Sequence, residues 1–214
     1  MAQVVQLTFN PFQENTFIVY DETGECVIFD PGCFDNAEQK TLSDKITELQ
    51  LRPVRLINTH CHLDHVFGNK YVADTYQLGL EIHEEELSML NAVPQICEMY
   101  GLPKPEPSPA PSSFLTPGET VEFGTTTLEM FFTPGHSPGS ISFYCREDKF
   151  VIAGDVLFYG SIGRTDLPGG DYDTLIRSIK TQLLPLGDDI TVYSGHGPAT
   201  RVGYERKNNP FLQD

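Results

Sequence analysis

Short apolar runs recur along both halves of the chain, and each predicts a β-strand. The predicted strands span residues 4–9, 16–20, 26–29, 54–58, 81–83, 120–123, 126–132, 140–145, 150–153 and 190–194. Apolar residues at helical spacing predict helices over residues 36–50, 67–76 and 172–183, and the beginning of a helix over 84–90. Two strand-rich halves that each contain helices indicate an α/β protein with mixed sheets.

Two of these helices have a well-defined apolar face. In residues 36–50 it comprises Leu42, Ile46 and Leu49, and Asn36 is the expected N-cap. In residues 172–183 the apolar face comprises Leu175, Ile179 and Leu183. We expect these faces to pack against the sheets.

The length of 214 residues and the formal net charge of -16 narrow the class of protein. A chain of this size is typical of one α/β unit, so we expect a single domain over residues 1–214. The acidic charge disfavours nucleic acid, which requires a basic face. No stretch approaches the roughly 20 apolar residues of a membrane span, and the first residues lack the features of a secretory signal.

The cysteines indicate the compartment. Five are scattered along the chain without a C-x-x-C pair: Cys26, Cys33, Cys61, Cys97 and Cys145. An odd number of isolated cysteines is typical of reduced thiols. We therefore expect a cytoplasmic protein. From the acidic charge and the lack of a long apolar stretch, we expect that it binds neither nucleic acid nor membrane.

The strongest chemical signal is H-x-H-x-D-H, which directly follows the predicted strand 54–58. Imidazole and carboxylate are natural ligands of a divalent metal such as zinc. His60 and His62 are two residues apart and project to the same side of an extended backbone. Asp64 and His65 follow as the chain turns and can face a second point nearby. The alternative is a solvated polar turn, which the rest of the sequence disfavours.

Three more candidate ligands each follow a strand-like run, with a glycine directly before them. They are His136, Asp155 and His196. Ligands at strand ends can converge on one edge of a sheet, and glycine permits close approach of the backbone. The set is large enough to hold two metal ions that share a bridging water.

Together these motifs resemble the metallo-β-lactamase-fold superfamily, and within it the single-domain glyoxalase II-like hydrolases. The matching segments are Asp30-Pro31-Gly32, T-H-C-H-L-D-H, T-P-G-H-S-P-G, Gly154-Asp155 and S-G-H-G. The resemblance covers nearly the whole chain. It implies an αβ/βα four-layer sandwich of two mixed sheets with helices outside.

The resemblance also implies roles for individual residues. The first metal site would consist of His60, His62 and His136, and the second of Asp64, His65 and His196. Asp155 would bridge the two ions. Asp30 would brace the ligand loop without binding metal, although a turn residue that accepts backbone N–H bonds is an equal alternative.

The implied cofactors are two divalent ions, with zinc expected first and iron or manganese as alternatives. Such ions lower the pKa of a shared water and give hydroxide near neutral pH, which attacks a carbonyl carbon. Asp64 and Asp155 would orient this nucleophile. The implied substrate is a small acyl thioester, such as an S-2-hydroxyacylglutathione.

Two further hypotheses belong to other classes. The G-R-T-D run at residues 163–166 also occurs in persulfide dioxygenases, which hold one iron with two histidines and an aspartate. Those ligands would be His60, His136 and Asp155 here. A non-catalytic metal-binding protein is the third hypothesis, and the complete ligand set disfavours it.

The G-R-T-D run contains Arg164, for which two roles are open. Its planar guanidinium suits a substrate carboxylate. It can equally pair with Asp166 or Asp171 to fix the loop. Full-length glyoxalase II proteins carry a C-terminal helical domain that helps to hold glutathione. The match ends shortly after Asn209-Pro210, so we expect that domain to be absent and the thiol carrier to be open.

Two single residues and three segments have simpler expected roles. Cys61 should point away from the metal if side chains alternate along the loop. His83 is expected to be structural rather than to line the site. Residues 84–86 are expected to be a solvated helical turn. Residues 205–207 match the E-R-x-x-N-P ending of the resembled family and are otherwise expected to be a solvated helical turn. The proline-rich residues 102–111 are expected to form an exposed loop, with a flap over the metal site as the alternative.

Overall fold

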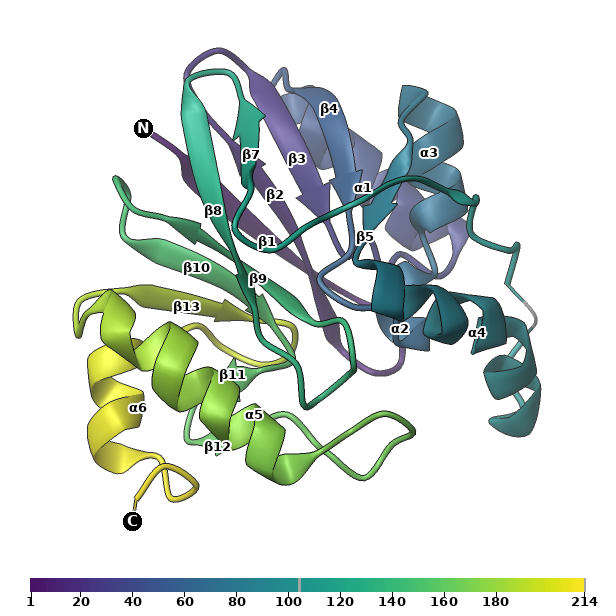
Figure 1. Cartoon of the computed structure of the whole chain (residues 1–214). Coiled ribbons are helices and arrows are strands. Elements are labelled where there is room, and N and C mark those ends of the chain that lie inside the picture. Colours follow the sequence, from purple (N-terminus) through teal and green to yellow (C-terminus); the bar gives the residue numbers. More distant parts are fainter. Residues whose placement is uncertain (104, 214) are drawn as a thin grey trace. The chain divides into compact units, whose positions relative to one another are not determined.

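The structure is a computed structural model that describes residues 1–103 and 105–213 (Figure 1). It divides into two compact units. The first comprises Met1–Leu115 and Glu122–Thr126, and the second comprises Thr116–Val121 and the residues from Thr127 onward. Each unit is built around one six-stranded sheet.

The sheet of the first unit has the strand order β1-β2-β3-β4-β5-β6. Its strands are β1 (Gln3–Phe9), β2 (Glu14–Tyr20), β3 (Glu25–Phe29), β4 (Arg52–Ile57), β5 (Leu80–Ile82) and β6 (Pro111–Phe114). The first three pair antiparallel, and the remaining pairs are parallel. The predicted strands agree to within two residues, whereas β6, which begins at the last residue of the predicted loop 102–111, was not predicted.

The helical segments of the first unit are α1 (Asn36–Glu48), α2 (Leu63–Val66), α3 (Asn69–Tyr76), η1 (Glu84–Glu86) and α4 (Leu87–Met99). The predicted N-cap of α1 is wrong by one residue. Asp35 has extended backbone and its carboxylate accepts the amides of Ala37 and Glu38, both at 2.9 Å. Asn36 already lies inside the helix, where its side chain cannot cap the first turn.

Helix α4 extends well beyond the helical start predicted over residues 84–90. It continues to Met99 and contains Pro94 in its interior. Leu90, Val93 and Cys97 are all buried on one face. Their spacing of three and four residues is the helical signal, and packing of this face outweighs the helix-breaking tendency of proline.

The sheet of the second unit has the order β14-β13-β10-β9-β8-β7. Its strands are β7 (Thr120–Phe123), β8 (Thr126–Phe132), β9 (Ile141–Cys145), β10 (Phe150–Gly154), β13 (Thr191–Ser194) and β14 (Thr200–Arg201). Strands β10 and β13 are parallel, and β8–β9, β9–β10 and β13–β14 are antiparallel. Both sheets are therefore mixed, as predicted.

A short hairpin, β11 (Leu157–Phe158) and β12 (Ser161–Ile162), follows β10. The helical segments of the second unit are α5 (Tyr172–Ser178), η2 (Ile179–Leu183), η3 (Leu184–Leu186) and α6 (Val202–Asn208). The predicted helix over 172–183 is thus an α-helix that ends in a π-helical turn. The side chains of Leu175, Ile179 and Leu183 are all fully buried, as the apolar spacing predicted.

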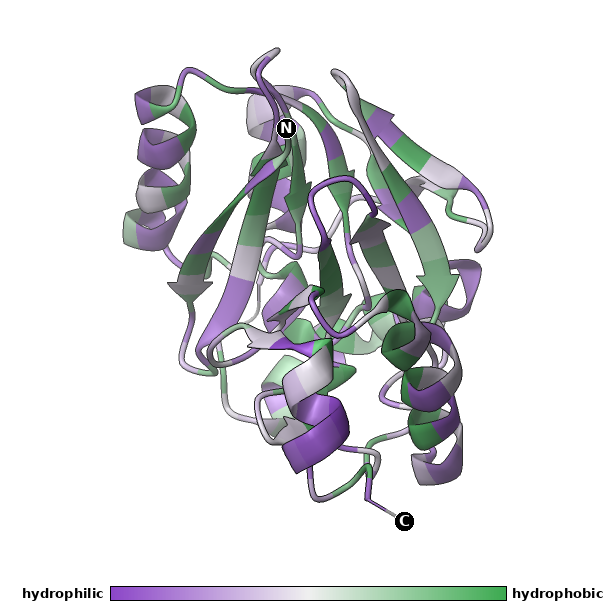
Figure 2. Ribbon diagram, turned by 90° about the vertical axis from the view of Figure 1, so that its left-hand side faces the viewer, coloured by the Kyte–Doolittle hydropathy of each residue, from purple (hydrophilic) through white to green (hydrophobic). Residues whose placement is uncertain are grey.

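Each unit has its own hydrophobic core. Ile28, Leu56 and Leu80 lie in the first core, and Val151 and Val192 lie in the second. Figure 2 shows that the strands are largely hydrophobic, whereas the helices also carry hydrophilic residues. Among the described residues, no helix combines the length and apolar character that crossing a membrane requires.

The strands place the candidate ligands as the sequence predicted. His60 lies in the loop after β4, and His136 lies in the loop between β8 and β9. Asp155 directly follows β10, and His196 follows β13 by two residues. Each of these four candidates therefore lies just past the end of a strand.

Candidate metal centre

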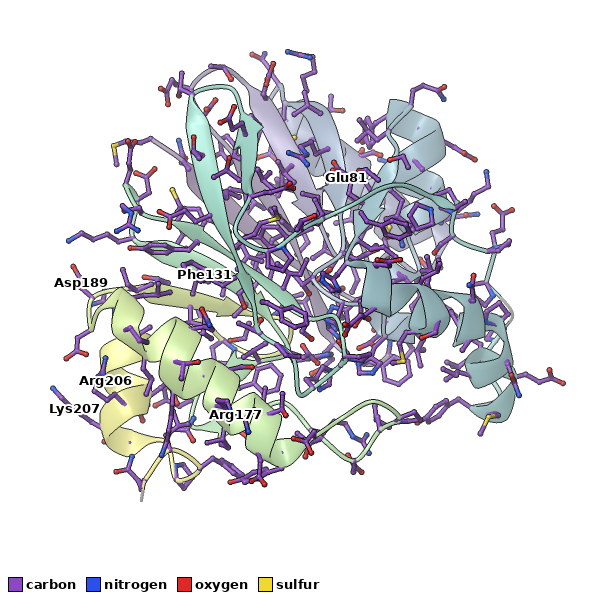
Figure 3. All side chains as sticks on the ribbon, viewed as in Figure 1. Glu81, Phe131, Arg177, Asp189, Arg206 and Lys207 are labelled. Atoms are coloured by element: carbon purple, nitrogen blue, oxygen red, sulfur yellow. The ribbon has the colours of Figure 1, made fainter. Side chains whose placement is uncertain are left out.

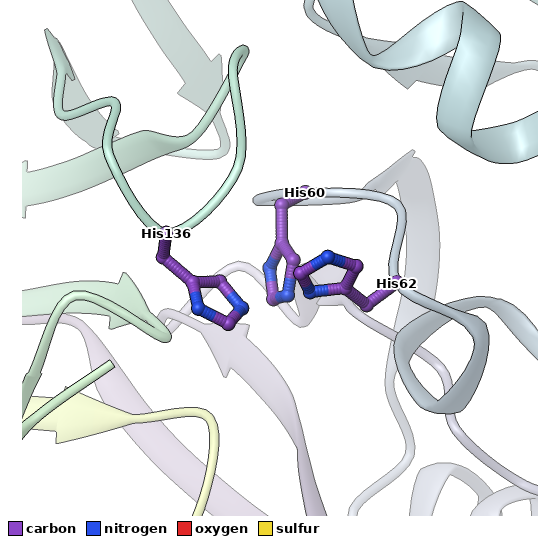
Figure 4. Close-up of side chains that lie close together, drawn as sticks. All are labelled: His60, His62 and His136. Carbon is purple, nitrogen blue, oxygen red and sulfur yellow. The ribbon is translucent and has the colours of Figure 1, made fainter. Parts of the chain in front are cut away.

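The first unit carries four of the candidate ligands close together in sequence, with His60 and His62 in the loop after β4 and Asp64 and His65 in helix α2. His60 and His65 are fully buried, and Asp64 is 8% exposed. The rings of His60 and His62 extend from the loop after β4 (Figure 4), with centroids 4.9 Å apart, and the centroids of His60 and His65 are 4.1 Å apart. Asp64 Oδ2 lies 3.8 Å from His65 Nε2. The motif therefore gathers imidazole and carboxylate groups within one small volume.

Asp30 connects this loop to the turn after β3. One carboxylate oxygen accepts the Thr59 amide at 2.6 Å, and the other accepts the Thr59 hydroxyl at 2.6 Å. Asp30 Oδ2 also lies 3.2 Å from His65 Nδ1. The Thr59 hydroxyl oxygen is 3.1 Å from His60 Nδ1. A single buried carboxylate therefore orients His65 directly and His60 through Thr59, an arrangement typical of metal-binding histidines.

Glu14 is a buried carboxyl group at the beginning of β2 that sequence patterns did not single out. Its Oε1 lies 3.8 Å from His65 Nδ1, and both side chains are fully buried. Burial raises the pKa of Glu14 well above its usual value. The charge of His65 opposes this shift, and the charges of Asp30 and Asp64 add to it. The only sequence signal was an acidic residue at the start of an apolar run.

Cys61 belongs to the hydrophobic core of the first unit and is 1% exposed. Burial raises the pKa of its thiol well above the usual range, and the charges of Glu86 and Asp30 raise it further. A buried thiol that resists deprotonation is a poor metal ligand. Its position in the core agrees with the prediction that Cys61 points away from the metal.

The second unit carries the other three candidate ligands. The ring of His136 extends from the loop after β8 (Figure 4). Asp155 Oδ2 lies 3.5 Å from His136 Nε2 and 3.5 Å from His196 Nε2. Two ligands of a tetrahedral metal, each about 2.1 Å from the ion, lie roughly 3.4 Å apart. The spacing on both sides of the Asp155 oxygen therefore fits a carboxylate that binds metal beside both histidines.

The backbone beside Asp155 sets the orientation of His136. The His136 Nδ1–H donates to the Arg164 carbonyl at 2.7 Å. This hydrogen bond directs His136 Nε2 toward Asp155. Gly163 makes this approach possible, because a Cβ there would lie 1.9 Å from the Asp155 carbonyl oxygen and 3.1 Å from His136 Nδ1. A side chain at this position would displace both groups.

The Arg164 side chain forms one of the two ion pairs that the sequence left open. Its Nε and Nη2 donate to the two carboxylate oxygens of Asp166 at 2.7 and 2.8 Å, in an exposed part of the loop. Hydrogen bonds from Arg164 lower the pKa of Asp166 to about 2. The side-chain pair joins two residues of this loop, while the Arg164 carbonyl accepts His136 Nδ1–H.

Two acidic residues that the sequence predicted to be solvated are buried. Glu86 in η1 and Glu205 in α6 both have a relative exposure of 0%, so these predictions are wrong. The Cys61 amide donates to Glu86 at 2.7 Å. Glu205 accepts hydrogen bonds from the Gly160 amide and the Thr200 hydroxyl. Local sequence did not reveal this burial, because Cys61 and Gly160 are distant in sequence from the carboxylates that they bind.

His83 and the proline-rich segment have roles within the first unit. His83 Nδ1 accepts the Glu85 amide at 3.3 Å, which caps η1 and fits the expected structural role. Residues 105–111 line a cleft of about 270 Å³ together with residues of α2 and α4. Residues 105–110 have neither helix nor strand and are exposed or half-buried, in agreement with the predicted loop. Lys104, which belongs to the predicted loop over residues 102–111, lies outside the described residues.

Histidines and aspartates at the strand ends of two mixed sheets define a metal-binding α/β protein. A family model for the metallo-β-lactamase superfamily matches residues 9–196. The chain belongs to the metallo-β-lactamase superfamily. Hydroxyacylglutathione hydrolase GloC of Haemophilus influenzae is 40% identical over 204 residues, which cover 94% of this chain and 93% of that protein.

Two crystal structures resemble the chain over nearly its whole length. The BLEG-1 B3 metallo-β-lactamase matches with a TM-score of 0.91 and 37% identity, covering 99% of this chain and 100% of that chain. TTHA1623 in a di-iron-bound form matches with a TM-score of 0.87 and 36% identity, covering 98% and 100%. The predicted fold class, the αβ/βα sandwich of this superfamily, is confirmed. The chain is a metallo-hydrolase with several His and Asp groups suited to metal.

Proposed function

We propose that the chain is a dinuclear hydrolase of small acyl thioesters. His60, His62 and His136 bind one ion, and Asp64, His65 and His196 bind the other. Asp155 bridges the two ions. Zinc is the expected metal, with iron or manganese as alternatives, and the cytoplasm is the expected compartment.

The observation that carries this proposal is the position of Asp155. One oxygen lies at 3.5 Å from the Nε2 atoms of both His136 and His196, which the proposal assigns to different ions. A carboxylate oxygen shared by two ions would lie about this far from one ligand of each ion. The di-iron-bound form of TTHA1623, which is similar over 98% of this chain, supports a two-metal centre.

Two ions bound there would supply an acidified water and a Lewis acid for the carbonyl group. The residues of the chain orient that chemistry. Asp64 and Asp155 offer acceptor oxygens that align the proton-bearing nucleophile. Asp30 and the Arg164 carbonyl fix the imidazole rings through their Nδ1 atoms, which keeps the ligands in place through turnover.

The substrate class rests on similarity and on Arg164. GloC of Haemophilus influenzae, named as a hydroxyacylglutathione hydrolase, is 40% identical to this chain. Arg164 lies next to Gly163, which closely approaches Asp155. We propose that the guanidinium exchanges Asp166 for a carboxylate of the thioester substrate. The bidentate pair with Asp166 supports this proposal, because a substrate carboxylate could accept the same two hydrogen bonds.

The test is elemental analysis of protein purified without added metal, with hydrolysis of S-lactoylglutathione and of a β-lactam assayed on the same sample. Close to two metals per chain with thioester turnover is the expected result. Two metals with β-lactam hydrolysis alone would overturn the thioester assignment. A single iron per chain would overturn the dinuclear assignment and favour the persulfide dioxygenase alternative, which oxygen uptake with a persulfide would then examine.

A further inference from the structure

A buried glutamate supports the loop that carries His60 and His62. Glu86 ends η1 with a relative exposure of 0%, while the neighbouring Glu84 and Glu85 are exposed. Removing a carboxylate from water is unfavourable unless hydrogen bonds replace its hydration. The burial of this one residue in a run of three glutamates therefore requires a specific partner.

One such partner is the backbone amide of Cys61, which donates to Glu86 Oε2 at 2.7 Å. Cys61 lies between His60 and His62, in a loop without helical or strand structure. Its amide meets a side-chain carboxylate where a strand or helix would supply a carbonyl. Hydrogen bonds to carboxylates are shorter and stronger than those between neutral groups, so this contact fixes the local backbone.

Two carboxylates hold alternate amides of the same loop. Asp30 accepts the Thr59 amide at 2.6 Å, and Glu86 accepts the Cys61 amide. The Cys61 side chain lies in the hydrophobic core. With alternate side chains on opposite faces, His60 and His62 then point away from that core. The backbone is thus fixed on both sides of His60.

Several hydrogen bonds hold the segment that carries Glu86. Strand β5 pairs in parallel with β4, and the Asn58 amide donates to the Glu81 carbonyl at 3.1 Å. Arg55 binds the Glu81 carboxylate with two hydrogen bonds, at 2.7 and 2.5 Å (Figure 3 labels Glu81). The Glu86 amide donates to the His83 carbonyl at 3.0 Å, which closes the turn after β5. The register of β4 and β5 therefore positions Glu86 against the loop.

We propose that Glu86 is a positioning residue of the metal centre, which holds the peptide between His60 and His62 so that both imidazoles face one ion. This role rests on the proposed assignment of His60 and His62 as ligands of the same metal. Glu86 acts through the Cys61 amide and not as a ligand. It complements Asp30, which acts on Thr59 and on the rings.

The test compares Glu86→Ala, Glu86→Gln and the matched control Glu85→Gln. The readouts are Zn²⁺ affinity from competition with a chelator and the visible absorption of the Co²⁺-substituted protein, which reports ligand geometry. Glu86→Ala is expected to weaken Zn²⁺ binding about 10–100-fold and to change the Co²⁺ spectrum. Glu86→Gln retains an acceptor oxygen and should recover most of the affinity. Glu85→Gln should match the wild type.

Wild-type affinity and spectrum in Glu86→Ala would overturn the proposal. Thermal unfolding of the metal-free variants separates positioning from loss of fold. If Glu86→Ala does not fold, Glu86→Asp takes its place. It keeps the charge but withdraws the oxygen from the amide, so it should bind Zn²⁺ more weakly than Glu86→Gln. Equal Zn²⁺ affinities of Glu86→Asp and Glu86→Gln would overturn the proposal.

These readouts do not depend on turnover. A wild-type protein that binds two metals but hydrolyses no thioester would refute the proposed substrate and leave the role of Glu86 standing. A wild-type protein that hydrolyses thioesters, with Glu86 variants that bind metal normally, would refute the role of Glu86 alone.

Discussion

Asp30 Oδ2 lies 3.2 Å from His65 Nδ1, and both side chains are buried. The same oxygen accepts the Thr59 hydroxyl, whose own oxygen is 3.1 Å from His60 Nδ1. Two histidines of the H-x-H-x-D-H motif thus depend on one carboxylate from the turn after β3. Of the two roles open for Asp30, bracing of the ligand loop therefore fits better than a simple turn.

Asp30→Asn is expected to weaken metal binding about 10–100-fold. The amide oxygen can still accept the Thr59 amide, but the NH₂ group would face His65 Nδ1–H and the Thr59 hydroxyl. The new NH₂ group and the existing N–H and O–H donors would then face one another without an acceptor. The imidazole rings of His65 and His60 would therefore lose their fixed orientation. Competition of Zn²⁺ with a chelator measures the effect.

Asp173→Asn serves as the control for this prediction, because it makes the same change at an exposed position in α5. The control should bind Zn²⁺ as the wild type does. An Asp30→Asn protein with unchanged affinity would show that the carboxylate is a turn residue only.

The sequence predicted the candidate ligands because their signals are local. Apolar runs mark β4, β8, β10 and β13, and a His or Asp follows each of them. The motif around His60 lies within seven consecutive residues. Short-range patterns of this kind require no knowledge of tertiary contacts.

The residues that support the ligands were not predictable in the same way. Glu84, Glu85 and Glu86 are chemically identical neighbours, yet only Glu86 is buried. Packing against the loop after β4 selects it, and no local pattern encodes that choice. Packing also decides the extent of α4, which contains Pro94 although a proline disfavours a helix in isolation.

Asp21 is expected to stabilise the first unit in a pH-dependent way. It accepts hydrogen bonds from Thr23, from the Thr125 amide at 2.6 Å and from the Thr126 hydroxyl at 3.0 Å. Burial alone would raise the pKa of Asp21, but these hydrogen bonds outweigh it and lower the pKa below the usual value. The folded protein therefore favours the charged carboxylate.

The unfolded carboxyl titrates near pH 3.9. Because the folded pKa is lower, the stabilisation is complete above about pH 4 and is lost as the pH falls further. Asp21→Asn should lower the free energy of unfolding at pH 7 by ~1–3 kcal/mol. It should also flatten the loss of stability below pH ~4. Urea unfolding of metal-free protein between pH 3 and 7 measures both effects.

Asp44→Asn is the matched control for Asp21, since Asp44 forms an exposed pair with Lys40. Its effect should stay below ~0.5 kcal/mol. Equal pH profiles for Asp21→Asn and the wild type would show that the carboxylate does not retain its charge preference in solution.

Glu205→Ala is expected to destabilise the second unit by ~2–4 kcal/mol. The carboxylate accepts the Gly160 amide at 3.0 Å, the Thr200 hydroxyl at 2.5 Å and the Asn209 amide group at 2.8 Å. Truncation would leave these donors without an acceptor in a buried site. Chemical unfolding compares it with Lys207→Ala, an exposed change in the same helix (Figure 3 labels Lys207). Equal free energies of unfolding for the two variants would contradict the stabilising role of the Glu205 carboxylate.

Asp155→Ala is expected to reduce the metal content below one ion per chain and to lower kcat/KM at least ~10²–10³-fold. The lost carboxylate oxygen lies at 3.5 Å from both His136 Nε2 and His196 Nε2. Its removal should therefore weaken the binding of both proposed ions. His196→Ala is the informative comparison, because it should remove one ion and leave the other bound. Elemental analysis and thioester hydrolysis on the same samples distinguish the cases. Two ions retained in Asp155→Ala would show that this carboxylate is not the bridge, because a bridging ligand contributes to both binding constants.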